Sequence, residues 1–171
     1  GRIGSRLVKR ALAFDMNVFV YDPYVDQSDI KKSGAVVVDN YKDILSKMDA
    51  VTLHCPKNDK TTDMFSTEEF NIMKDSSFLI NCARGGIVNE KALYDALTSN
   101  KIRAAGLDVY DDEPSTSSNP LFSLDNILLS PHIAGVTIEA TIRMSKQAVQ
   151  NVLDVFDNKI DPEVIINKNV L

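Results

Sequence analysis

The stretch GRIGSRLVKRALAFDMNVFVYDPY, residues 1–24, decides the fold of this 171-residue chain. Gly1 and Gly4 precede an amphipathic run, and Asp22 follows the next apolar run, eighteen residues after Gly4. A dinucleotide-binding fingerprint reads G-x-G-x-x-G between a strand and a helix, with an acidic residue about 20 positions further on. The two glycines match its second and third glycines, so we expect the first glycine and its strand to lie upstream of residue 1.

The composition is that of a folded, acidic protein. Hydrophobic residues make up 44% and charged residues 25% of the chain, and the net charge is -5. The lysines are scattered and form no basic face that could neutralise the phosphates along a nucleic acid, so DNA and RNA are excluded as main partners. No apolar run approaches the ~18–20 residues of a membrane span, so no membrane partner is expected. Cys55 and Cys82 are expected to be buried thiols of a reducing, cytoplasmic compartment.

Apolar strands alternate with helical patterns along the whole chain. Such alternation, with nearly continuous apolar strands, predicts an α/β fold: a Rossmann-like, doubly wound parallel sheet with helices on both faces. Strands are expected at 17–21, 35–38, 50–55, 77–83, 102–110 and 126–131, and helices at 3–14, 41–48, 66–74, 89–100 and 138–156.

The strand expected upstream of residue 1 would occupy the middle of such a sheet, whose strand order is 3-2-1-4-5-6. Without it, two strand edges are left unpaired and apolar faces are exposed. We therefore expect the chain alone to be poorly stable and inactive.

Ligands of doubly wound sheets bind outside the carboxyl ends of the strands. Nearly every chemically useful side chain of this sequence falls at such a position. These residues are Asp22, His54, Cys55, Pro56, Cys82, Ala83, Arg84, Asp108, Glu113 and His132.

The glycines and Asp22 predict how a dinucleotide would bind. The amides at a helix N-terminus attract a pyrophosphate, and a carboxylate after the second strand accepts hydrogen bonds from ribose hydroxyls but repels a 2′-phosphate. Pro23 and Tyr24 supply no arginine for that phosphate, so we expect NAD rather than NADP. The alternative is that Asp22 only begins a proline turn.

Three further segments carry the remaining motifs: NCARGGIVNEKAL (81–93), AAGLDVYDDEP (104–114) and LLSPHIAG (128–135). With the glycine fingerprint, they resemble the D-isomer-specific 2-hydroxyacid dehydrogenases, from Gly1 to about Val136 and on through the last helix. The resemblance implies that Arg84, Glu113 and His132 are the catalytic trio.

The chemistry of a hydroxy-acid oxidation requires these residue types. His132 can hold or release the hydroxyl proton near neutral pH. Glu113 would orient the imidazole and stabilise its charged form, and Arg84 would clamp the substrate carboxylate with its planar guanidinium. Taken singly, the three could be a loop histidine, a turn acid and a surface arginine. Their order at successive strand ends favours the catalytic interpretation.

The resemblance also implies a set of residues that line the cofactor. His54 is expected to be structural or cofactor-lining, and Asp108 to contact the nicotinamide end. No metal site is expected, because the two histidines are far apart and no ligand spacing recurs. The predicted cofactor-binding residues are Gly1, Arg2, Ile3, Gly4, Asp22, His54, Cys55, Pro56, Cys82, Ala83, Arg84, Asp108, His132, Ala134 and Gly135.

Residues 1–136 are thus expected to form an NAD-binding domain, and residues 137–171 a helix and tail that return toward a substrate domain absent from the chain. The implied activity is hydride transfer between nicotinamide and a D-2-hydroxy acid, first of all 3-phosphoglycerate, with reduction of glyoxylate or hydroxypyruvate as the alternative. A homodimer is implied too. From another class, an NADH-sensing protein similar to the C-terminal binding corepressors would keep the same trio.

Overall fold

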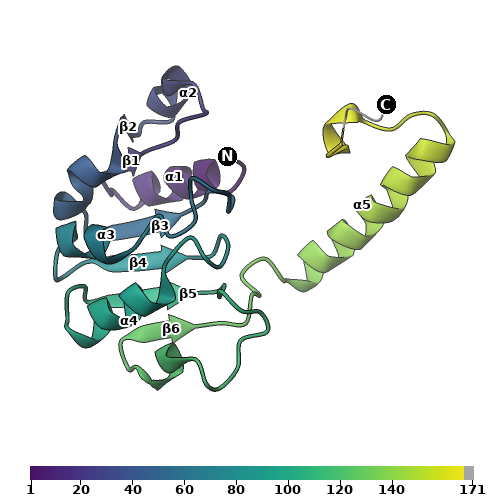
Figure 1. The fold of residues 1–171 in the computed structure, drawn as a ribbon. Coiled ribbons are helices and arrows are strands. Elements are labelled where there is room, and N and C mark those ends of the chain that lie inside the picture. Colours follow the sequence, from purple (N-terminus) through teal and green to yellow (C-terminus); the bar gives the residue numbers. More distant parts are fainter. Residues whose placement is uncertain (168–171) are drawn as a thin grey trace. The chain divides into compact units, whose positions relative to one another are not determined.

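The structure is a computed structural model that describes residues 1–167. The chain divides into two compact units, and the boundary falls between His132 and Ile133. The first unit alternates strands and helices, and the second contains one long helix (Figure 1). The first unit carries the predicted catalytic trio.

All strands of the first unit run parallel to their neighbours, as the sequence predicts. They form a two-stranded sheet and a four-stranded sheet, the latter in the order β3-β4-β5-β6. The strands are β1 (Phe19–Val20), β2 (Val36–Val37), β3 (Ala50–Leu53), β4 (Phe78–Asn81), β5 (Ala104–Leu107) and β6 (Ile127–Leu129).

No pairing joins β1 to β3 among residues 1–167, so each of these strands has one unpaired edge. The interruption falls where the sequence predicts that a central strand is missing from the sheet. The expected pair of open edges is therefore confirmed.

Short helices connect the strands. Asn89 caps α4 by accepting the amide hydrogen of Ala92, and Ser66 and Glu69 form a capping box at α3. These local signals end the preceding loops and start the helices at the predicted places. The helices are α1 (Gly4–Ala13), α2 (Gln27–Lys32), α3 (Thr67–Ile72), α4 (Glu90–Thr98) and α5 (Ile138–Phe156), with 3-10 helices η1 (Tyr41–Lys47), η2 (Pro120–Ser123) and η3 (Pro162–Val164).

The core lies between the four-stranded sheet and the adjacent helices α3 and α4, which lie across one face of the strands (Figure 1). Leu79 on β4 and Leu93 on α4 are fully buried. On the opposite face of the same strands, Phe78 is 40% and Leu128 is 78% exposed. These exposed apolar side chains lie on β4 and β6 and not at the open edges of β1 and β3, so they are a separate feature from the exposure expected of a missing central strand.

Three expectations of local structure need correction. Residues 41–47 form a 3-10 helix rather than an α-helix, a geometry common in short connectors. Helix α2 was not expected, although Asp26 caps it and lysines fill its last turn. The strands are shorter than predicted, because the residues past their carboxyl ends leave the ladder and form the loops of the candidate site.

No helix in residues 1–167 is both long and apolar enough to cross a membrane.

Candidate active site

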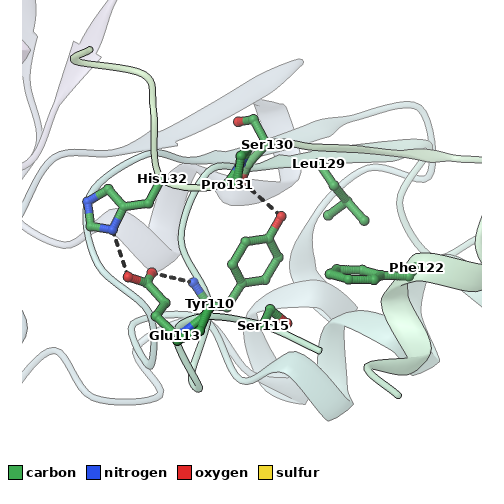
Figure 2. Close-up of a pocket in the computed structure, with 9 residues that line it drawn as sticks. Tyr110, Glu113, Ser115, Phe122, Leu129, Ser130, Pro131 and His132 are labelled. Carbon is green, nitrogen blue, oxygen red and sulfur yellow. Dashed lines mark hydrogen bonds and ion pairs between the residues drawn. The ribbon is translucent and has the colours of Figure 1, made fainter. Parts of the chain in front are cut away.

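His132 and Glu113 form the centre of the candidate site. The Nδ1 atom of His132 lies 2.7 Å from Oε2 of Glu113 (Figure 2). Because Nδ1 is engaged by the carboxylate, the other ring nitrogen, Nε2, is the atom left to exchange a proton with a substrate. The pair has the geometry that the sequence analysis expects of a carboxylate that orients a histidine.

The backbone also constrains this pair. His132 has a φ of 55°, in the left-handed region that residues other than glycine rarely adopt. Oε1 of Glu113 accepts a hydrogen bond of 3.0 Å from the amide of Tyr110. Unusual backbone conformations of this kind cluster at functional sites, where the surrounding structure holds them.

The hydrogen bond from His132 is the main reason that the pKa of Glu113 is lowered from its ordinary value of 4.5. The amide of Tyr110 contributes next, and the positive charge of Arg84 adds a smaller effect in the same direction. Both oxygens of the carboxylate are therefore held in an environment that favours its charged form.

This shift makes the His132–Glu113 pair sensitive to acid. A carboxyl with a lowered pKa stabilises the fold above its ordinary value of 4.5, and this contribution is lost as the pH falls through the lower folded value. We expect the carboxyl carbon of Glu113 to titrate below 4.5 in an NMR experiment, and His132→Ala to raise the midpoint. An unchanged midpoint in the variant would contradict the pairing. The gain in stability is below ~1 kcal/mol, because the pair is partly exposed.

A turn after β4 presents Arg84. The buried side chain of Asn81 holds this turn: Oδ1 accepts the amide of Ala83 at 3.0 Å, and Nδ2 donates to the carbonyl of Arg84 at 2.9 Å. The guanidinium of Arg84 is exposed and donates to the carbonyl of Ala83 at 2.6 Å. Arg84 therefore acts on the His132–Glu113 pair through the electrostatic effect of its charge on Glu113. To bind the Arg84 guanidinium, a substrate carboxylate would have to replace the carbonyl of Ala83 as hydrogen-bond acceptor.

The two glycines after Arg84 allow two motifs to meet. A Cβ atom on Gly85 would overlap the carbonyl group of Tyr110 and lie 2.9 Å from the amide nitrogen of Asp111. Gly86 has a φ of 72°. Only a residue without a side chain lets the segment after β4 pack directly against the segment that carries Glu113.

Partly buried hydrogen bonds join the residues that follow β5 and β6. Asp108 is 2% exposed, and its Oδ1 accepts a 2.6 Å hydrogen bond from the hydroxyl of Ser130. The Tyr110 hydroxyl donates to the carbonyl of Ser130 at 3.0 Å. These bonds join the segment that precedes Glu113 to the segment that precedes His132.

A cavity of about 720 Å³ opens beside the His132–Glu113 pair (Figure 2). Tyr110 and Phe122 pack edge to face on its wall, with ring centroids 5.8 Å apart. The cavity therefore combines an apolar wall with one acid–base pair, the combination found in small-molecule sites. Its lining residues are Tyr110, Glu113, Pro114, Ser115, Phe122, Leu129, Ser130, Pro131 and His132.

The predicted pyrophosphate site lies at the start of α1. A Cβ atom on Gly4 would lie 3.7 Å from Cβ of His54, so the first turn of the helix packs against the end of β3. His54 is held by a 3.0 Å hydrogen bond between Nε2 and the Thr52 hydroxyl. Partial burial lowers the pKa of His54, which favours a neutral ring at this position.

Asp22 follows β1 and serves a turn. Its Oδ1 accepts the amides of Tyr24 at 3.0 Å and Val25 at 3.2 Å, as in an Asx turn. The turn that the sequence analysis raised as an alternative is thus present. It uses one oxygen of the carboxylate, and the other is compatible with a ribose contact.

The cysteines differ from expectation. Cys55 is half-buried and Cys82 is exposed, so they are not a pair of buried thiols. Both follow the last paired residue of a strand, where the chain leaves the sheet for the surface. Partial burial raises the pKa of both thiols, so neither favours the reactive thiolate.

The structure thus brings some of the predicted residues together and leaves others apart. Glu113 and His132 are in direct contact, and Gly4 packs against His54. Ala134 and Gly135 belong to the second unit. The roles of all predicted cofactor residues remain predictions.

The scaffold residues Asn81 and Ser130 are not among the predicted site residues. Asn81 stands at the carboxyl end of a strand next to a predicted site segment, which is the one signal that could have revealed it. Ser130 carries no local signal, since its partner Asp108 lies 22 residues away.

Comparison with known proteins identifies the class. The sequence profile of the NAD-binding domain of the D-isomer specific 2-hydroxyacid dehydrogenases matches residues 1–134. The chain belongs to this family of NAD-dependent oxidoreductases, and the matched part is its NAD-binding domain. NAD is accordingly the cofactor.

Curated relatives carry different substrate names. The chain is 39% identical over 170 residues to the D-3-phosphoglycerate dehydrogenase of Methanocaldococcus jannaschii, an alignment that covers 99% of this chain and 32% of that protein. It is 34% identical to the glyoxylate reductase of Korarchaeum cryptofilum, covering 100% of this chain and 51% of that protein. The chain therefore spans about a third to a half of these relatives.

Solved structures agree on the fold. The NAD-complexed D-isomer specific 2-hydroxyacid dehydrogenase of Lactobacillus delbrueckii ssp. bulgaricus superposes with a TM-score of 0.85 at 28% identity, covering 98% of this chain and 53% of that one. The D-lactate dehydrogenase of Aquifex aeolicus, complexed with NAD and lactic acid, gives 0.82 at 33% identity, covering 93% and 52%. Both contain the parallel Rossmann-like arrangement described above.

Proposed function

We propose that the complete protein transfers hydride between NAD and a D-2-hydroxy acid, with 3-phosphoglycerate as the first substrate to test. The contact between His132 Nδ1 and Glu113 Oε2, 2.7 Å long, carries this proposal. Glyoxylate and hydroxypyruvate are the alternative substrates, in keeping with the mixed names of the relatives.

The residues present fit NAD. Helix α1 is ten residues long and begins at Gly4, so the positive end of its dipole suits a pyrophosphate. The amides of Ser5 and Arg6 already donate to the carbonyls of Gly1 and Ile3, so the amides before Ser5 would meet the pyrophosphate. Asp22 keeps one carboxylate oxygen out of the Asx turn for the adenosine ribose. When bound, the nicotinamide supplies or accepts the hydride.

His132 provides the proton in the reductive direction. Nε2 donates it to the carbonyl oxygen of the 2-keto acid as hydride reaches the carbonyl carbon, which gives the 2-hydroxy acid. In the oxidative direction Nε2 accepts the hydroxyl proton. Throughout, Glu113 holds Nδ1 and stabilises the charged ring.

Arg84 is proposed to bind the substrate carboxylate. Its guanidinium offers two parallel donors and a positive charge to that group. Without substrate, the guanidinium of Arg84 donates a hydrogen bond to the carbonyl of Ala83. When substrate binds, the substrate carboxylate replaces this carbonyl as the acceptor.

The experiment is NADH oxidation by the complete protein against a panel of 2-keto acids: 3-phosphohydroxypyruvate, hydroxypyruvate, glyoxylate and pyruvate. Turnover of one or more members is expected, and the largest kcat/KM names the substrate. Tight NADH binding without turnover on any member would instead assign the protein to the NADH-sensing class.

Several properties implied by the resemblance remain proposals. They are a homodimer, a cytoplasmic location, and the division into a domain of residues 1–136 and a returning segment of residues 137–171.

A further inference from the structure

We propose that Glu90 is a positioning residue that holds the segment 110–119 in place and thereby sets the Glu113 carboxylate beside His132. This inference rests on the proposed function, because it assigns a task within the same site. Glu90 stands at the start of α4, outside the cavity and apart from the predicted trio.

One carboxylate closes the loop at both ends. Oε1 of Glu90 accepts the amide of Asp111 at 2.8 Å, and Oε2 accepts the side-chain amide of Asn119 at 2.8 Å. Glu113 lies between these two attachment points. The carboxylate of Glu90 therefore ties this segment to α4 at two points, one before and one after Glu113 in the sequence.

Both sides of this bridge are themselves anchored. On one side, α4 is capped by Asn89 and packed through the fully buried Leu93. On the other side, Asn119 is the N-cap of η2, and its Oδ1 accepts a hydrogen bond of 3.0 Å from the amide of Leu121. Glu90 thus connects two ordered elements across a loop that has no regular structure of its own.

The bridge reaches Glu113 through one residue, Tyr110, whose two flanking peptide groups supply the two amides. The amide of Tyr110 donates to Oε1 of Glu113, and the next amide, that of Asp111, donates to Glu90. A shift of the Asp111 amide therefore moves the donor that orients Glu113. Outer hydrogen bonds of this kind commonly position the groups that carry out chemistry.

The two partners require a carboxylate at this position. The two groups that donate hydrogen bonds to Glu90 are both N–H groups, and a carboxylate offers only acceptors. In Glu90→Gln one carboxylate oxygen becomes an NH₂ group. This NH₂ group then faces another N–H donor, either the amide of Asp111 or the side-chain amide of Asn119, and cannot accept its hydrogen bond. The substitution keeps the shape of the side chain and breaks one of the two attachments.

The test uses the complete protein and a paired substitution. Glu90→Gln is expected to lower kcat about 10- to 100-fold while KM for NADH stays unchanged, since small misplacements of catalytic groups carry losses of this order. Asn119→Asp alone places a second carboxylate next to that of Glu90. The two negative charges repel each other, so this variant should also lower kcat. The double variant Glu90→Gln/Asn119→Asp restores one donor and one acceptor, and kcat should largely recover.

Glu68→Gln is the matched control. Glu68 is also in the first turn of a helix and is 70% exposed, and its side chain forms a surface ion pair with Lys42, far in sequence from segment 110–119, so kcat should not change. Unchanged kcat in Glu90→Gln, or a loss that the double variant does not recover, would overturn the proposal.

A second measurement does not depend on turnover. In Glu90→Gln the NMR titration of the Glu113 carboxyl should move up toward its ordinary value, because the Tyr110 amide is no longer held. A titration that does not move would overturn the inference even if no 2-keto acid is reduced. Absence of turnover in the unsubstituted protein would count against the proposed function alone.

Discussion

Replacement of His132 by alanine in the complete protein is expected to reduce kcat for 2-keto acid reduction by about 10²–10⁴-fold, the usual contribution of a general acid. The variant keeps the carboxylate of Glu113 but removes the Nε2 atom that delivers the proton. NADH binding should weaken much less than kcat falls, because the predicted pyrophosphate site lies at α1 and His132 is only one of the predicted cofactor-binding residues. Steady-state kinetics with a titration of NADH fluorescence measure both quantities.

His54→Ala provides the matched control, since His54 is the other of the two histidines. His54 packs against Gly4 and bonds to Thr52, and no hydrogen bond to Glu113 is found for it in residues 1–167. We expect the control to weaken NADH binding and to leave kcat at saturating NADH nearly unchanged. Equal losses of kcat in the two variants would contradict the assignment of the acid–base role to His132.

Gly85→Ala is expected to have the second large effect. The new Cβ would overlap the Tyr110 carbonyl, which is backbone and cannot rotate away. Overpacking of this kind costs about 1–3 kcal/mol of stability, and a displaced Tyr110 amide moves Glu113. We therefore expect a lower thermal unfolding midpoint together with a loss of kcat of about 10²-fold.

Gly106→Ala is the control for this substitution. Gly106 lies on β5, and a Cβ atom added there meets no atom within 4 Å. A glycine-to-alanine change at a compatible site raises stability by about 0.4–1 kcal/mol, so the midpoint should not fall. If both variants unfold alike and keep full activity, close packing at Gly85 has no role in the site.

The sequence predicted the parallel sheet and most of its helices, and it did so from local information. Apolar periodicity located the strands now seen at Phe78–Asn81 and Ala104–Leu107, and the caps Ser66 and Asn89 marked two helix starts. It failed at Gln27–Lys32, where six residues are too short for a clear helical period. The predicted strands are too long, because the apolar runs in the sequence extend beyond the residues that pair with a neighbouring strand.

In the candidate site, the sequence determines which residues stand at the strand ends, and the tertiary structure determines which partners hold them. The positions of Arg84, Glu113 and His132 at strand ends follow from the order of the motifs, since parallel strands bring their carboxyl ends to one edge. The partners that hold them do not follow, because Glu90 meets Asp111 and Asn119 across 21 and 29 residues of sequence. Hydrogen bonds over such distances depend on how separate elements pack, and no local pattern of residues encodes that packing.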